Sequence, residues 1–174
     1  MYLDIVLNIN LDMSSAIDMY SVYTKTLYDK SNIINDKLKN TLKMFDSLNV
    51  NNVSVKDYCY RFSKYLKISP SCFIYAICIL DKCIDKNIVI VTSTNILKLT
   101  LTMLLLSAKM LEDDIYNNEY WARLGGVDLT TINKFEKHIL ESIDYKIHFD
   151  LLEYKNKLNR LRNAYLRSLG CYYN

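Results

Sequence analysis

Two stretches of this chain, residues 71–85 and 99–108, are apolar on nearly every side and constrain the fold more than any other feature. They read SCFIYAICILDKCID and LTLTMLLLSA. A helix without a polar face has to be enclosed by other helices. Neither stretch reaches the roughly 18 apolar residues that a membrane span needs. The sequence therefore predicts a globule built around two buried helices, with no membrane-spanning segment.

The composition favours helices throughout. Three Gly and one Pro in 174 residues are too few for an architecture of strands and tight turns. Apolar residues at helical spacing predict helices over residues 14–27, 32–48, 54–65, 71–85, 94–109, 118–124, 130–143 and 150–169. The alternation of apolar residues over 3–11 hints at a strand. The fold class that we predict is all-α.

Several helix ends carry their own signals. Ser54 is a predicted N-cap, and Asp57 follows in the first turn, where the helix dipole favours a carboxylate. Ser69 followed by Pro70 predicts a cap and a first helical residue. The glycine pair at 125–126 predicts the end of the preceding short helix.

The formal net charge of +3 is concentrated in the last 25 residues. Residues 150–174 contain two acidic residues, Asp150 and Glu153, and five basic ones: Lys155, Lys157, Arg160, Arg162 and Arg167. A basic helix of this kind is typical of a solvated face, and it is also compatible with binding to nucleic acid. The first interpretation is favoured, and nucleic acid is not an expected partner.

The cysteines indicate a reducing environment. Their number is odd, and the N-terminal sequence MYLDIV lacks the basic start of a secretory signal. We therefore expect reduced thiols and a cytoplasmic or nuclear protein. The spacing of Cys72, Cys78 and Cys83 does not match structural zinc patterns, so these residues are expected to be core thiols and no metal is predicted.

No catalytic motif stands out. The chain contains no glycine-rich phosphate loop, no HExxH and no GxSxG, so an enzyme, a cofactor and a small-molecule substrate are not expected. The acidic turn at 112–114 has the composition of a cation site, but a solvated turn explains it better.

Four segments together resemble the cyclin box of the P-type, or U-type, cyclins. They are KDYCYRFSKYLKISPSCF from residue 56, IYAICILDKCI from 74, SAKMLEDD from 107, and NNEYWARLGGV from 117 with INKFEKHIL from 132. The resemblance implies a single five-helix cyclin box over 53–149. Outside the box, the spacing of apolar residues predicts an N-terminal helical extension over 1–52 and a basic C-terminal helix over 150–174. The sequence departs from the family pattern at Leu97, Lys98 and Thr131.

The resemblance also implies a function. Cyclins bind and activate cyclin-dependent-type serine/threonine kinases by positioning the kinase's αC helix, so a kinase partner in a heterodimer is expected. The residues that match the family's kinase-contacting charged pair are Lys109 and Glu136. Four residues near Lys109 in the sequence are expected to complete the kinase-binding surface, since interfaces favour Met and aromatic residues: Met110, Leu111, Glu112 and Tyr116. From spacing alone, Lys109 and Glu136 would be a surface salt bridge worth about 0–1 kcal/mol, and the aromatic residues near Tyr116 would pack the core. Trp121 is the aromatic residue most expected in the core.

Two further residues, Arg61 and Asp81, match positions at which cyclins carry an internal ion pair. An aspartate that follows a long apolar run is costly unless it is paired. We therefore expect both residues to have a structural role. The alternative function is that of a cyclin-fold adaptor or scaffold in transcription or nucleic-acid complexes, without kinase activation, in which the basic tail would bind phosphates.

Overall fold

The computed structural model describes residues 10–31, 45–46 and 53–170, and the fold in these ranges is all-α. The helices are α2 (Met13–Ser31), α3 (Val55–Tyr65), α4 (Ser71–Asp85), α5 (Ile96–Leu111), α6 (Asn118–Gly125), α7 (Leu129–Ser142) and α8 (Leu151–Ser168). The prediction of an all-α fold is confirmed. The predicted strand over 3–11 and the predicted helix over 32–48 lie almost entirely outside the described residues.

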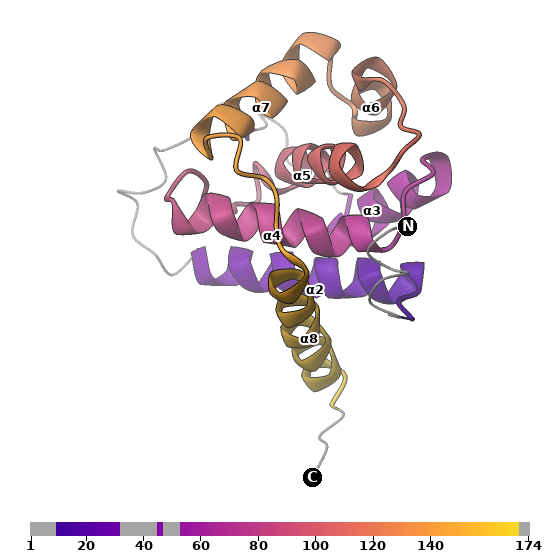
Figure 1. Ribbon diagram of the computed structural model, residues 1–174, viewed down its shortest axis with the longest axis vertical. Coiled ribbons are helices and arrows are strands. Elements are labelled where there is room, and N and C mark those ends of the chain that lie inside the picture. The colour runs from indigo at the N-terminus through magenta and orange to yellow at the C-terminus, as the bar shows by residue number, and fades with distance from the viewer. Residues whose placement is uncertain (1–9, 32–44, 47–52, 171–174) are drawn as a thin grey trace.

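The two apolar stretches form the centre of the molecule, as predicted. Helices α4 and α5 pack against each other, α2 and α8 cover α4, and α6 and α7 cover α5 (Figure 1). Every residue of α4 from Ser71 to Leu80 is buried, and so is every residue of α5 from Leu99 to Ala108. The buried hydroxyl groups of α5 donate to carbonyl oxygens one turn earlier in the same helix, so their burial leaves no hydroxyl donor unpaired.

Local signals determine the helix ends. The Ser54 hydroxyl oxygen accepts a hydrogen bond from the Asp57 amide at 3.0 Å and caps α3, as predicted. Helix α6 is terminated by its C-cap residue Gly126, which has a left-handed φ of 73°. The prediction for α4 was wrong in one detail: Ser69 does not cap it, and the first helical residue is Ser71. The Ser69 side chain makes no capping bond, and its backbone amide donates to the carboxylate of Glu112, the residue just after α5.

Helix α2 and one short segment after it pack on the same core as the later helices. Phe45 is fully buried, and its ring stacks on that of Phe135 in α7 with centroids 4.5 Å apart. Asp46 accepts hydrogen bonds from the Thr94 hydroxyl (2.8 Å) and from Lys98 Nζ (2.6 Å). The residues on the two sides of position 52 therefore share one continuous core.

The predicted basic C-terminal helix is α8, which is docked on the globule at its start and extends away from it at its end (Figure 1). Its N-terminus has a capping box made by Asp150 and Glu153. Tyr154, Leu158 and Leu161 are its buried residues. One apolar face of α8 is therefore buried, and its basic residues other than Lys157 are exposed to solvent.

Gly125 lies too close to α5 to carry a side chain. An added Cβ would be 2.5 Å from Leu101 Cδ2, and Leu101 is fully buried. We expect Gly125→Ala to lower the free energy of unfolding by about 1–3 kcal/mol, as overpacked cores do. Urea unfolding measures this change. In a Leu101→Ala background the loss should be smaller, and an unchanged loss in that background would contradict the steric cause.

Candidate functional site

Lys109 and Glu136 meet at one edge of the molecule, as the resemblance implied. Lys109 is in the last turn of α5, Glu136 is in the middle of α7, and the two helices pack against each other. Lys109 Nζ lies 2.5 Å from Glu136 Oε1. The Lys109 side chain is 32% exposed and that of Glu136 is 16% exposed. The pair is therefore more sheltered than an ordinary surface salt bridge, yet the ammonium group remains accessible.

Two asparagines extend this pair into a network that the sequence did not reveal. Asn118, the first residue of α6, donates through Nδ2 to Glu136 Oε2 at 2.7 Å and to Asn133 Oδ1 at 2.7 Å. Each oxygen of the Glu136 carboxylate thus accepts one hydrogen bond, from Lys109 on one side and from Asn118 on the other. The sequence predicts Asn118 only as the start of a helix. Its neighbour Asn117, whose side chain accepts from the Tyr120 amide, is the cap.

The apolar residues predicted to surround the pair divide into two groups. Met110 and Tyr116 are each 39% exposed, and Ile115 is also exposed. Leu111 is half-buried and packs against the core. The Tyr116 ring stacks on that of Tyr120 at a centroid distance of 4.3 Å, which fixes its direction. An apolar rim of Met110, Ile115 and Tyr116 therefore remains open to solvent.

Trp121 belongs to the core, as predicted. It is 1% exposed, and its ring stacks on that of Phe62 at 5.7 Å. The cysteines also behave as predicted, because Cys72, Cys78 and Cys83 are buried. Burial raises the pKa of Cys78 and of Cys83 to about 12, so these thiols stay protonated.

Glu112 has a structural contact that the sequence did not predict. Its Oε1 accepts hydrogen bonds from the Ser69 amide at 2.7 Å and from the Cys72 thiol at 3.1 Å, so it ties the end of α5 to the residues at the start of α4. Burial alone would raise the pKa of Glu112, but the bonds from Ser69 and Cys72 together outweigh burial and hold the pKa below its ordinary value. Asp113 and Asp114 beside it are exposed, as expected of a solvated turn.

This lowered pKa predicts a pH-dependent contribution of Glu112 to stability. The contribution is fully present above the ordinary value of 4.5 and is lost as the pH falls through the lower value of the folded state. Glu112→Gln keeps the acceptor oxygen but has no charge to titrate. We expect the difference in unfolding free energy between the native protein and Glu112→Gln to shrink below about pH 4.5. A difference that stays constant between pH 7 and pH 3 in urea unfolding would contradict this account.

The predicted ion pair between Arg61 and Asp81 is wrong. Asp81 accepts hydrogen bonds from the Tyr23 hydroxyl of α2 and from Lys157 of α8, with which it forms an ion pair. Arg61 is exposed, where its guanidinium lies over the Tyr58 ring and donates a long bond (3.5 Å) to a carbonyl oxygen of α6. The need for a partner at Asp81 was correctly predicted, but that partner comes from the C-terminal helix.

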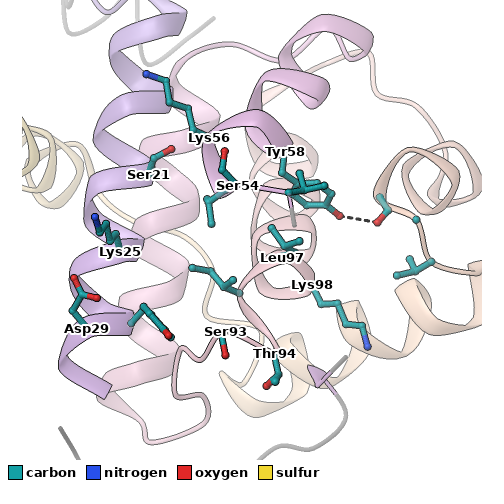
Figure 2. A pocket seen from close by; sticks show the side chains of 17 residues that line it. Ser21, Lys25, Asp29, Ser54, Lys56, Tyr58, Ser93, Thr94, Leu97 and Lys98 are labelled. Atoms are coloured by element: carbon teal, nitrogen blue, oxygen red, sulfur yellow. Dashed lines mark hydrogen bonds between the residues drawn. The ribbon is translucent and has the colours of Figure 1, made fainter. Parts of the chain in front are cut away.

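A pocket of about 510 Å³ lies elsewhere on the molecule, between α2, the starts of α3 and α5, and the turn after α6 (Figure 2). Tyr58 closes one end and donates from its hydroxyl to the Gly125 carbonyl oxygen at 2.8 Å. Leu97 lies at its centre, while the amino groups of Lys56 and Lys98 point away from it (Figure 2). Lys56 is paired with Asp18 at 2.6 Å. The pocket is therefore mainly apolar, with Lys25, Asp29, Lys56 and Lys98 among the residues that line it.

The described ranges contain neither a cluster of metal ligands nor a membrane-spanning helix. No group of three His, Cys, Asp or Glu side chains in these ranges is placed to hold a metal ion. No helix in the same ranges is both long and apolar enough to cross a membrane.

Comparison with known proteins identifies relatives of this chain. The family model of cyclins matches residues 4–147. Cyclin-P3-1 of Oryza sativa is 30% identical over 116 residues, which are 67% of this chain and 49% of that protein. Cyclin-U3-1 of Arabidopsis thaliana is 33% identical over 110 residues, or 63% of this chain and 50% of that protein. Cyclin-U4-3 of Arabidopsis thaliana is 30% identical over 155 residues, which are 86% of this chain and 71% of that protein. The chain thus spans about half the length of the first two relatives.

Proposed function

Because the chain belongs to the cyclin family, in its P- or U-type branch, we propose that it is a regulatory subunit that binds and activates a cyclin-dependent-type serine/threonine protein kinase. The observation that carries the proposal is the sheltered pair of Lys109 and Glu136. The two helices hold this pair at an accessible edge, and the exposed apolar rim lies next to Lys109 in the chain. Met and Tyr are enriched in protein interfaces, and charged groups beside them fix the orientation of a partner.

The proposed mechanism is positional. The chain contributes no catalytic group, and the kinase holds ATP and the substrate. Docking against the Lys109–Glu136 edge moves the kinase's αC helix inward, so that the kinase's own Lys–Glu ion pair forms and the phosphates of ATP are positioned. Such a role places the protein in the cytoplasm or the nucleus.

Within the proposed interface, the predicted contact residues have different tasks. Lys109 and Glu136 contact the kinase directly, and Met110 and Tyr116 pack against its apolar side chains. Leu111 and Glu112 support the interface without contacting the kinase directly. Leu111 packs on the core, and the Glu112 carboxylate is already bonded to the Ser69 amide, just before α4. A stable heterodimer usually buries more than about 1,200 Å², so further surface has to join this edge.

Complex formation tests the proposal. Each cyclin-dependent-type kinase of the source organism is mixed with the purified chain, and complexes are detected by size-exclusion chromatography. A second sample contains Lys109→Ala with Glu136→Ala, after circular dichroism has verified that this variant is folded. We expect one or more kinases to elute with the native chain and not with the variant. The proposal fails if no kinase binds the native chain at micromolar concentration.

One observation favours a second function, that of a nucleic-acid adaptor. Lys155, Arg160, Arg162 and Arg167 are exposed on α8, and the described residues provide no ion-pair partner for any of them. This basic face is smaller than the sequence indicated, because Lys157 is used internally. Duplex DNA binding that falls steeply as salt rises from 50 to 200 mM would support this function.

A further inference from the structure

We propose that Asn118 is a positioning residue of the kinase-binding site, which fixes the Glu136 carboxylate and ties it to the loop that carries Tyr116. This inference rests on the proposed function. It assigns a role to the start of α6, a segment whose length and capping alone describe an ordinary short helix.

The direction of each hydrogen bond around Asn118 follows from the chemistry of its partners. An ionised carboxylate only accepts hydrogen bonds, so the group that Asn118 turns toward Glu136 has to be its NH₂. The same NH₂ also faces Asn133 at 2.7 Å, so Asn133 has to present its oxygen. Asn118 thereby donates one amide proton to the Glu136 carboxylate and the other to the side-chain oxygen of Asn133, both in α7. The orientation of the whole network is fixed by Glu136.

This network restricts Glu136 more than an ion pair alone would. A lysine bonded to one carboxylate oxygen still leaves the side chain several rotamers, because an ammonium group on a long stem follows its partner. A second donor on the other oxygen, coming from a short side chain at a helix start, removes that freedom before the kinase arrives. Because binding has to immobilise the side chains at an interface at an entropic cost, a preorganised Glu136 strengthens docking.

The same contact helps to determine where the loop residues of the apolar rim lie. Asn118 follows Tyr116 by two residues and is the first residue of α6. A bond from Asn118 to α7 therefore sets the position of the loop between α5 and α6 relative to the charged pair. Tyr116 lies in that loop, so its spacing from Glu136 also depends on Asn118, whereas Met110 is held by α5.

Asn118→Asp removes the positioning contact without weakening α6. A carboxylate in the first turn of a helix interacts favourably with the helix dipole, whereas a carboxylate next to Glu136 repels it. Asn117→Asp is the matched control: it adds the same charge one residue earlier, and aspartate caps a helix as well as asparagine does. We expect Asn118→Asp to weaken kinase binding about 10-fold, equivalent to about 1.4 kcal/mol. Asn117→Asp should remain within about twofold of the native chain, on the order of the small effect of surface charges.

A double-mutant cycle separates positioning from a merely structural role. In a Glu136→Gln background the side-chain amide can donate to the new aspartate, so Asn118→Asp should cost less than about twofold in affinity. If Asn118→Asp weakens binding equally in both backgrounds, or if it matches Asn117→Asp, the inference is wrong. The proposed function would still stand in either case, because the native chain would still bind the kinase.

A measurement on the isolated chain tests the inference even without a kinase. Side-chain amide resonances of ¹⁵N-labelled protein are assigned by comparison with the Asn118→Asp and Asn117→Asp variants. We expect Glu136→Gln to shift both amide protons of Asn118 and to leave those of Asn117 in place. Unshifted Asn118 resonances would show that the bond to Glu136 is not formed, and the inference would be overturned whatever the kinase experiments give.

Discussion

Replacing Asp81 by alanine is expected to lower the free energy of unfolding by about 3 kcal/mol, since it removes one partner of a sheltered ion pair. Asp81 joins three helices, because it lies in α4 and accepts from Tyr23 of α2 and Lys157 of α8. The Asp81 and Lys157 side chains are only 18% and 23% exposed, so solvent replaces the lost bonds poorly. Burial and the bond to Asp81 raise the pKa of Tyr23, so its hydroxyl remains a proton donor that needs an acceptor.

Arg61→Ala is the matched control for this prediction. Arg61 is exposed and has no carboxylate partner among the described residues, so its loss should change the free energy of unfolding by less than about 0.5 kcal/mol. Thermal unfolding distinguishes the two variants, because 3 kcal/mol in a chain of this size lowers Tm by about 6–12 °C. If Asp81→Ala and Arg61→Ala lowered the free energy of unfolding equally, the result would contradict this account and support the ion pair between Arg61 and Asp81 that the family resemblance implied.

Reversing the charge of Glu136 is expected to weaken kinase binding about 100-fold or more. Glu136→Lys puts an ammonium group beside Lys109, and it also removes the acceptor of Asn118. Like charges brought together at an interface cost several kcal/mol. The free protein tolerates the change better than the complex does, because Lys109 can turn toward solvent when no kinase covers it. Isothermal titration calorimetry of the kinase with the native chain and with Glu136→Lys measures the ratio of the two affinities.

Glu141→Lys supplies the control for this charge reversal. Glu141 is in the same helix and is exposed, and its only ion pair among the described residues is a 3.7 Å contact with Lys137. Glu141→Lys changes the net charge of the protein by the same amount as Glu136→Lys, so the long-range attraction to the kinase changes equally in the two variants. We expect affinity within about threefold of the native chain, because exposed pairs of this kind contribute about 0–1 kcal/mol. A loss as large as that of Glu136→Lys would mean that net charge, and not the site, controls binding.

The helices were predictable where burial alone determines them. Helices α4 and α5 are enclosed because a helix with no polar face has no other stable environment, and their apolar runs mark their positions in the sequence. Ser54 and the glycine pair act through bonds to residues nearby in the chain, so the ends of α3 and α6 could be predicted as well. The pair of Lys109 and Glu136 was found only through the family resemblance, since its partners are 27 residues apart.

The remaining errors concern contacts between distant segments. Asp81 needed a cation, but a helical pattern does not say whether the cation comes from α3 or α8. Glu112 lies in an acidic turn that looks solvated in the sequence, yet the fold places its carboxylate at the start of α4. Asn118 sits next to the true cap and resembles a second capping residue until α7 is placed beside it. Each of these roles depends on how two helices cross, which local spacing does not contain.

The most direct test of the proposed function is the rate of phosphate transfer by the partner kinase, measured alone, with the native chain and with the variant that carries Lys109→Ala and Glu136→Ala. Both chains are added at increasing concentration until the rate no longer changes. A cyclin is expected to raise the rate with the native chain, and the variant should need a far higher concentration or should fail to activate. A kinase that binds the native chain without becoming faster would contradict the account and would identify the protein as a scaffold.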